Sequence, residues 1–242
     1  ASLGELRAGR DFVPSYVGWS RYDPFSYVGV ASSSNFVASS QNGPIRAAFG
    51  TTPNTTVRSS NALQWLAPSG LGGLEGGVLF AAGEGGLAAN GQHKVVGARV
   101  GYGQKAFGVS AAFTRSENDL TTDGAFKDTS LGGSYDFGVV RMSLAWRRFA
   151  VADAKQTNLI VGAWVPVGST GEARLSFNRV DLSGQVGGAR IDANDATQLG
   201  VGYVHGLSKR SAVYGTLARI SNKGDATFAI SGGPSGLAGG RT

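Results

Sequence analysis

The feature that most constrains this chain is an alternation of apolar and polar residues with a period of two. In residues 107–114, Phe, Val, Ala and Phe occupy the odd positions, and Gly, Ser, Ala and Thr occupy the even ones. The pattern recurs in residues 130–137, 140–147, 173–178 and 198–203. Because successive side chains of a β-strand point to opposite faces, this pattern predicts strands with one apolar face.

We expect eleven such strands, each about as long as the 9–11 residues with which a tilted strand crosses a bilayer. Short turns alternate along the chain with longer connections, which is typical of outer-membrane barrels. The connection 150–155 is an exception, since it is shorter than the others on its side. The expected strands are 3–10, 57–67, 73–84, 93–103, 105–115, 127–137, 139–149, 156–165, 171–181, 196–206 and 211–221.

The composition supports a β-protein in lipid over other classes. The chain has 39 Gly, 16% charged residues, 10% aromatic residues and no Cys, which excludes disulfide-stapled modules and thiolate metal sites. A soluble β-sandwich is the alternative, but it should expose a more highly charged face than this sequence offers. The uncharged stretch 24–45 is too rich in Ser to cross a bilayer as a helix, so membrane insertion requires a closed β-barrel.

A net charge of +6 raises the question of nucleic-acid binding. The basic residues are spread singly, however, and the densest clusters are pairs such as Arg147 with Arg148. Dispersed cations fit a nucleic-acid stripe poorly, so we expect no nucleic-acid partner. We interpret the excess instead as an arginine-biased channel interior.

One connection, residues 11–56, is far longer than the usual four to six residues or so. We expect it to fold into the interior of the barrel, where Phe25, Tyr27, Phe36 and Phe49 would pack internally. The alternative is an external loop without fixed packing.

Several segments resemble the Gram-negative general porins. Residues 4–10 and 58–68 are similar to the strands before and after that family's constriction loop, and residues 192–203 and 207–214 are similar to its late strands. The tail 232–240 resembles its last long loop. The similarity keeps the family's motif order and is closest to its anion-preferring branch.

The resemblance implies an all-β fold, a transmembrane antiparallel barrel of sixteen strands in the full-length family, and a homotrimer in the outer membrane. It implies passive diffusion of small hydrophilic solutes and ions, contact with the lipid bilayer and lipopolysaccharide, and no enzymatic activity or cofactor. Aligned by its motifs, the chain would begin at the fifth strand and end before the sixteenth. We therefore expect residues 1–242 to form one incomplete barrel domain, with residues 11–56 as its constriction loop.

Charged rings set the selectivity of pores, with Arg and Lys favouring anions. The alternation places Arg7, Arg58, Arg99, Arg141, Arg147, Arg174 and Arg219 on the interior face, against the carboxylates Glu5, Glu75 and Asp136. This balance predicts an anion preference. The alternation points Arg10 outward, whereas the resemblance places it at the root of the loop, and a β-bulge would reconcile the two. The expected pore-lining set is Arg7, Arg10, Arg46, Arg58, Arg99, Arg141, Arg174, Asp23 and Glu75.

Aromatic side chains near the strand ends of the apolar face suit an interfacial girdle. Their alternative is the core of a soluble sheet. The expected girdle consists of Trp65, Tyr102, Phe107, Phe113, Tyr135, Phe137, Trp146 and Tyr203.

Two other membrane functions stay open: an adhesin or receptor, and a barrel hydrolase. A hydrolase would need a His beside a Ser or Asp at one rim, and the chain has only His93 and His205. No metal-binding or Walker motif occurs, and the glycines of residues 101–106 join two expected strands, which argues against a dinucleotide loop.

Overall fold

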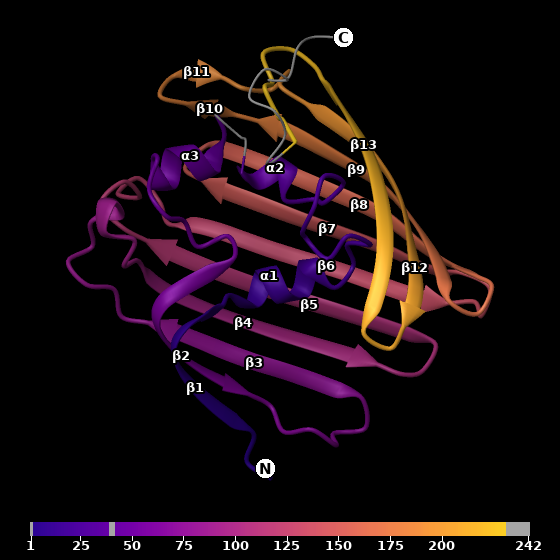
Figure 1. The fold of residues 1–242 in the computed structure, drawn as a ribbon. Helices are drawn as coiled ribbons and strands as arrows, with labels where there is room; N and C mark the ends of the chain where they lie inside the picture. Colours follow the sequence, from indigo (N-terminus) through magenta and orange to yellow (C-terminus); the bar gives the residue numbers. More distant parts are fainter. Residues whose placement is uncertain (1, 39–41, 231–242) are drawn as a thin grey trace.

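A computed structural model of the chain describes residues 2–38 and 42–230, and its main feature is one antiparallel sheet (Figure 1). Eleven strands lie in it in chain order, each hydrogen-bonded to the next. The expected all-β antiparallel fold is confirmed. The strands are β1 (Glu5–Phe12), β2 (Arg58–Leu66), β3 (Leu74–Ala81), β4 (Lys94–Gly103), β5 (Phe107–Glu117), β6 (Phe126–Asp136), β7 (Arg141–Val151), β8 (Ala154–Val167), β9 (Gly171–Ser183), β12 (Ala196–Ser208) and β13 (Ser211–Asn222).

The sheet is curved and its two edges do not meet within the described residues. β1 pairs with β2 alone and β13 with β12 alone. Figure 1 shows β12 and β13 curling in front of the other strands, so that the sheet has a concave and a convex side. The segment between β1 and β2 lies on the concave side.

Three short α-helices lie in that segment, where the sequence pattern indicates none: α1 (Pro14–Ser20), α2 (Asn35–Ala38) and α3 (Pro44–Phe49). Two of them begin with a proline, whose fixed φ suits the first helical position. A 3-10 turn, η1, covers Ala88–Asn90. In the described residues, no helix is long and apolar enough to cross a membrane.

A small hairpin, formed by β10 (Gln185–Val186) and β11 (Ala189–Arg190), lies in the connection between the expected strands 171–181 and 196–206. The expected tail loop at residues 232–240 falls outside the described residues.

The convex face is apolar along the strands, as the alternation predicts. Val100, Leu144 and Val201 are 53%, 55% and 52% exposed, whereas their neighbours on the other face are buried or half-buried. The concave face is more apolar than expected near the longer connections. There Phe126, Phe149 and other strand residues form a core with side chains of α2 and α3.

The register corrects one expected position. Arg219 stands directly opposite Leu199 in the β12–β13 pair. Opposite residues of an antiparallel pair share a face, and Leu199 is 58% exposed on the convex side. Arg219 therefore points outward, because the alternation of β13 is offset by one residue from the one assumed from sequence.

Candidate functional site

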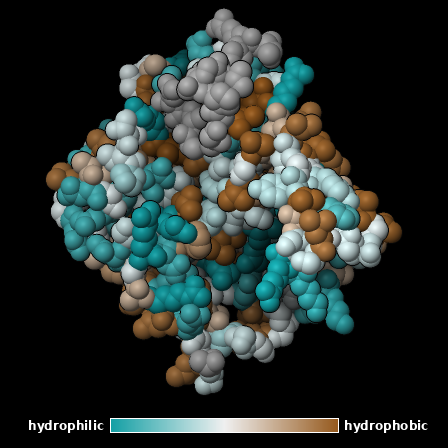
Figure 2. Space-filling view, viewed as in Figure 1, coloured by the Kyte–Doolittle hydropathy of each residue, from teal (hydrophilic) through white to brown (hydrophobic). Residues whose placement is uncertain are grey.

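Residues 13–38 and 42–57, which we call the inner segment, pack against the concave face of the sheet. Helix α1 contacts β4, β5, β6 and β7, and helix α3 contacts β6, β7 and β8. The four aromatic residues proposed as packing partners are all buried: Phe25, Tyr27, Phe36 and Phe49 are 7%, 9%, 2% and 1% exposed. Figure 2, which views this side, shows hydrophilic residues on both sides of a hollow.

Side chains of the strands bind the backbone of the inner segment. In the sequence, these side chains are the small and polar residues of the concave face. They donate hydrogen bonds to carbonyl groups that burial would otherwise leave unpaired. The donors and the carbonyls that accept from them are Ser130 to Ser15 (3.0 Å), Ser143 to Tyr22 (2.7 Å), Gln156 to Phe36 (2.7 Å) and Gln198 to Ala31 (2.8 Å).

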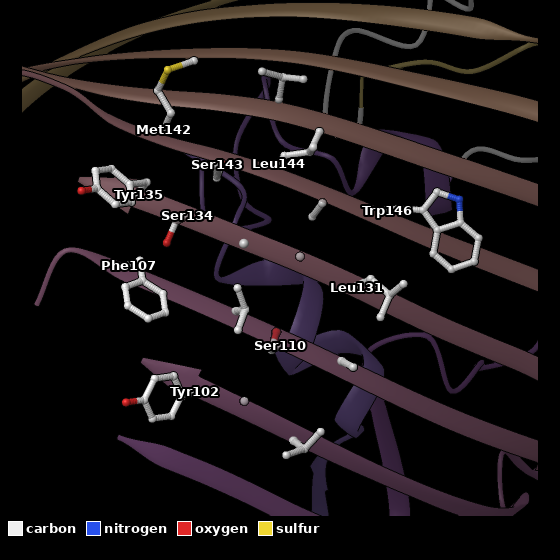
Figure 3. A pocket seen from close by; sticks show the side chains of 18 of the residues that line it. Tyr102, Phe107, Ser110, Leu131, Ser134, Tyr135, Met142, Ser143, Leu144 and Trp146 are labelled. Atoms are coloured by element: carbon white, nitrogen blue, oxygen red, sulfur yellow. The ribbon is translucent and has the colours of Figure 1, made fainter. Parts of the chain in front are cut away.

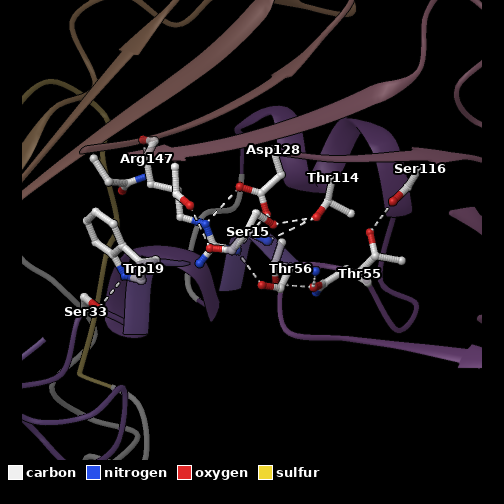
Figure 4. A network of polar contacts seen from close by, with 12 residues as sticks. Ser15, Trp19, Ser33, Thr55, Thr56, Thr114, Ser116, Asp128 and Arg147 are labelled. Atoms are coloured by element: carbon white, nitrogen blue, oxygen red, sulfur yellow. Dashed lines mark hydrogen bonds and ion pairs between the residues drawn. The ribbon is translucent and has the colours of Figure 1, made fainter. Parts of the chain in front are cut away.

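An ion pair between Arg147 and Asp128 lies at the centre of this contact (Figure 4). Both side chains are 1% exposed. Arg147 donates from Nε and Nη2 to the two carboxylate oxygens at 2.9 and 2.7 Å, and Nη2 also donates to the carbonyl of Thr56. The hydroxyl of Ser15, at the start of α1, donates to Asp128 at 2.6 Å. The Arg147–Asp128 pair thus holds both ends of the inner segment, and its charges neutralise each other.

A glycine on the concave face allows the inner segment to approach the sheet closely. A Cβ atom at Gly132 would lie 2.3 Å from the ring of Tyr22, which is shorter than any real contact. Residue 132 must therefore lack a side chain for the turn after α1 to reach the sheet.

Asp23 does not line an open channel, in contrast to the sequence-based expectation. It is 1% exposed, and its carboxylate accepts hydrogen bonds from the backbone N–H groups of Phe25, Tyr27 and Ser33 and from the Ser33 hydroxyl. Burial raises the pKa of Asp23, and the four donors oppose that shift. The residue organises the turn that follows α1, because an Asp can bond to its own nearby backbone.

Charged side chains gather near the short-turn end of the concave face. Glu75 on β3 forms ion pairs with Arg21 of the inner segment and, at 3.5 Å, with Arg99 of β4. Arg174 of β9 donates to Glu172 at 2.7 Å and to the carbonyl of Pro24 at 3.2 Å. The structure thus brings these arginines toward the inner segment from several strands.

Arg141 of β7 lies at the same end, with its guanidinium 4.0 Å from the centre of the Trp164 ring. Four arginines and three carboxylates thus lie at this end of the sheet. They are Arg21, Arg99, Arg141 and Arg174, and Glu75, Asp136 and Glu172.

The remaining expected pore residues lie elsewhere. Arg7 is paired with Glu5 and Asp11 on β1, and Arg46 is exposed on α3. Arg58 lies 4.4 Å from the ring of Phe12. The register of β1 against β2 shifts between Gly9 and Asp11, so an irregularity occurs at Arg10, which is exposed.

Sequence reasoning missed three members of this site: Asp128, Glu172 and Arg21. The alternation that placed Arg174 on the concave face applies equally to Glu172, two residues earlier on β9. The alternation that placed Asp136 on the concave face applies equally to Asp128, eight residues earlier on the same strand. Arg21 carried no signal, because its position depends on the path of the inner segment.

The expected aromatic girdle lies on the convex face. Trp65, Tyr102, Phe107, Phe113, Tyr135, Phe137 and Tyr203 are 38–58% exposed, and Trp146 is half-buried. Most of them lie toward the short-turn end of the strands. Phe113 and Trp146, however, lie near the middle of β5 and β7 and not near a strand end as expected.

Neither histidine forms a hydrolase-like arrangement within the described residues. His93 lies 2.9 Å from the carbonyl of Pro53 and 3.1 Å from the amide of Asn118, and His205 lies 3.2 Å from the hydroxyl of Tyr203. No group of His, Asp or Glu in residues 2–38 and 42–230 could hold a metal ion.

Comparison with known proteins gives consistent matches. A family model described as Gram-negative porin matches residues 1–225. Outer membrane porin protein 32 of Delftia acidovorans is 30% identical over 239 residues, which is 95% of this chain and 63% of that protein. The chain therefore spans less than two thirds of its curated relative.

Solved structures agree with this match. The anion-selective porin from Comamonas acidovorans superimposes with a TM-score of 0.74 and 29% identity, covering 94% of this chain and 66% of that one. A loop-deletion mutant of the outer membrane protein OmpT of Vibrio cholerae shares the fold, with a TM-score of 0.68, 12% identity, and coverage of 92% and 72%.

Proposed function

Because this chain belongs to the Gram-negative porin family of outer-membrane β-barrel proteins, we propose that it forms a water-filled channel. Small hydrophilic solutes and ions would cross it by passive diffusion. Its strands would belong to one barrel domain, with residues 11–56 as the constriction loop. Porins perform no chemical reaction, so the functional residues are those that set the width and the electric field of the channel.

The observation that carries this proposal is the inner segment. It is held against the polar concave face of the sheet by buried hydrogen bonds and the Arg147–Asp128 pair. The opposite face of the sheet is apolar. A sheet that is apolar outside and carries a fixed polar obstacle inside suits a narrowed aqueous channel in a bilayer.

A measurement of solute flux tests whether the protein forms a channel. Liposomes that contain the protein should swell in small sugars and swell progressively less as the sugar becomes larger, whereas protein-free liposomes should not respond. Specific ligand binding by the inserted protein without any solute flux would favour an adhesin or receptor instead.

The channel should prefer anions. The anion-selective porin from Comamonas acidovorans is similar over most of this chain, and four arginines face three carboxylates near the short-turn end of the concave face. Three of these arginines lie on β-strands. Arg99 and Arg174 have side chains that are 13% and 30% exposed, whereas Arg141 is exposed. Arg99 and Arg174 should contribute most to the field, because partly buried charges are screened less by salt.

A reversal potential under a KCl gradient tests the preference. The protein should be anion-selective, and R99Q R174Q should shift the reversal potential toward that of an unselective pore. K209Q R210Q removes two exposed cations from the turn between β12 and β13 and should leave the potential unchanged. Cation selectivity of the unmodified protein would contradict the proposal.

The proposed partners are the lipid bilayer, lipopolysaccharide and two further copies of the protein in a homotrimer. The apolar convex face and its aromatic residues support contact with lipid. Trimer formation is testable by cross-linking in the membrane.

A further inference from the structure

A row of residues crosses five neighbouring strands of the concave face close to the short turns. The register sets this row, because each member stands directly opposite the next on β6, β7, β8, β9 and β12. The members are Asp136, Arg141, Trp164, Arg174 and Gly202. Tyr135 and Met142, the sequence neighbours of the first two members, project from the convex face instead (Figure 3). We call the three central members, Arg141, Trp164 and Arg174, the arginine–tryptophan row.

The inner segment covers the sheet next to this row and leaves both of its arginines accessible. An added Cβ at Gly162, two residues before Trp164 on the same face, would lie 2.6 Å from Cγ of Pro24. Pro24 therefore packs against β8 one step along the strand from Trp164. Arg141 is exposed, and the side chain of Arg174 is 30% exposed. A solute at the short-turn end of the concave face can therefore reach both guanidinium groups.

Within the described residues, the charge of Arg141 has no carboxylate partner. Asp136 stands directly opposite Arg141, but Oδ1 of Asp136 accepts a hydrogen bond from the backbone N–H of Gly138 at 2.8 Å. The guanidinium of Arg141 lies 4.0 Å from the centre of the Trp164 ring instead. Since Trp164 is 7% exposed, its ring covers one side of the guanidinium and leaves the other side to solvent. Guanidinium groups stack on aromatic rings, so this outer side can accept a second ring.

Arg174 offers a hydrogen-bond donor on the other side of Trp164. Its Nε donates to Glu172 at 2.7 Å and its Nη1 to the carbonyl of Pro24 at 3.2 Å. These two bonds fix the guanidinium, while Nη2 has no partner in the part of the chain that the structure describes. The backbones of Arg141 and Arg174 are two strand spacings apart, which is about 10 Å. This span suits a small ligand with a flat ring at one end and an anionic group at the other.

We propose that the arginine–tryptophan row binds aromatic carboxylates as they pass through the channel. The ring of the ligand stacks on the outer side of the Arg141 guanidinium, and its carboxylate accepts a hydrogen bond from Nη2 of Arg174. The inference rests on the proposed function, because it requires the concave face to border the path of solutes. An aliphatic anion would meet the same charges without the stacking contact, and a neutral aromatic compound would lack the contact with Arg174.

Binding of benzoate and of cyclohexanecarboxylate to the detergent-solubilised protein tests the proposal. The two anions have the same charge and a similar size, but only benzoate has a flat aromatic ring. Titrations followed by saturation-transfer NMR give both affinities. Benzoate should bind about two- to fivefold more tightly, which corresponds to one cation–π contact at an exposed site.

Three variants separate the roles of the two arginines. R141K keeps the charge but removes the planar group, so it should weaken benzoate binding about two- to fivefold and cyclohexanecarboxylate binding less than about twofold. R174Q should weaken the binding of both anions by a similar factor of about three or more, because both use its charge. R148K is the matched control, since the guanidinium of Arg148 lies 5.1 Å from the Trp146 ring on the convex face. It should change neither affinity.

Equal affinities of the unmodified protein for the two anions would overturn the proposal. Equal effects of R141K on both anions, or of R141K and R148K on benzoate, would overturn it as well. Conductance measured on the same preparations separates this site from the channel. A protein that conducts ions but shows no preference for benzoate keeps the channel and loses the site. Benzoate binding with the expected dependence on Arg141, by a protein that conducts no ions, keeps the site and removes the channel.

Discussion

Two ion pairs in this protein have the same length and opposite surroundings. In the first pair, Nη2 of Arg147 lies 2.7 Å from Oδ2 of Asp128, and each side chain is 1% exposed. In the second, Nη2 of Arg179 lies 2.7 Å from Oδ1 of Asp181, and the side chains are 53% and 41% exposed. Removing one partner of a buried pair leaves an uncompensated charge, whereas an exposed charge is solvated by water.

D128N should therefore lower the free energy of unfolding by about 3–5 kcal/mol, while the matched variant D181N should change it by less than about 1 kcal/mol. Guanidinium unfolding of the detergent-solubilised protein measures both. Similar losses in the two variants would mean that the Arg147–Asp128 pair does not hold the inner segment.

Asp23 should make the free energy of unfolding depend on pH. Burial raises the pKa of this carboxyl in the folded state above its value of about 3.9 in an unfolded chain. The folded state therefore holds the proton more tightly, so the stabilisation from this group is complete below the unfolded pKa and is lost as pH rises through the folded pKa.

The difference in unfolding free energy between the unmodified protein and D23N should thus decrease as the pH rises above the unfolded pKa of about 3.9. Because the other titrating groups are common to both proteins, the subtraction isolates Asp23. A difference that increases with pH would show that the four hydrogen-bond donors outweigh burial.

The sequence predicts which face of the sheet a side chain occupies better than it predicts which groups that side chain contacts. The alternation placed Arg147 on the concave side correctly, but its pairing with Asp128 depends on the register of β6 against β7 and on the carbonyl of Thr56. The same limit applies to Asp23, whose burial depends on the fold of the inner segment.

At the level of secondary structure, the close contact between the inner segment and the sheet depends on the absence of side chains at particular positions. Gly132 and Gly133 are neighbours on β6 that face opposite sides. An added Cβ would lie 2.3 Å from Tyr22 at Gly132, but no closer than 3.4 Å to any atom at Gly133.

G132A should destabilise the protein by about 1–3 kcal/mol and make the inner segment more sensitive to trypsin, which cleaves after Arg21 and Arg46. G133A, as the matched control, should leave the cleavage rate close to that of the unmodified protein. Equal rates of trypsin cleavage for the unmodified protein, G132A and G133A would contradict the close packing of α1 and the turn that follows it.

Strands were predictable because alternation is a local property, and all eleven appear in the expected order. The short helices of the inner segment were not, because tertiary contacts stabilise them more than their own sequence does. The β10–β11 hairpin had an overlooked signal, the Gly187–Gly188 turn, in which both residues have positive φ.

Across the whole molecule, the distribution of charge differs from the sequence interpretation. The excess of cations was assigned to the channel interior, yet Arg147 is neutralised by Asp128. Several other cations are exposed on the convex face, namely Arg115, Lys127, Arg148 and Lys155. The arginines left to act on a permeating ion are those near Glu75 and Pro24, where strands and inner segment meet.

If the inner segment narrows an aqueous channel, a charge added to it should alter the ion current. The chain has no cysteine, so a single introduced thiol can be modified without background. Arg21, 34% exposed beside Glu75, lies on the inner segment, whereas Lys209 lies in a turn outside it.

Single-channel conductance of R21C, before and after reaction with a charged methanethiosulfonate reagent, is therefore the most direct test. We expect a clear stepwise fall in conductance for R21C and no change for the control K209C. An unchanged conductance of fully modified R21C would show that the inner segment does not border the path of the ions.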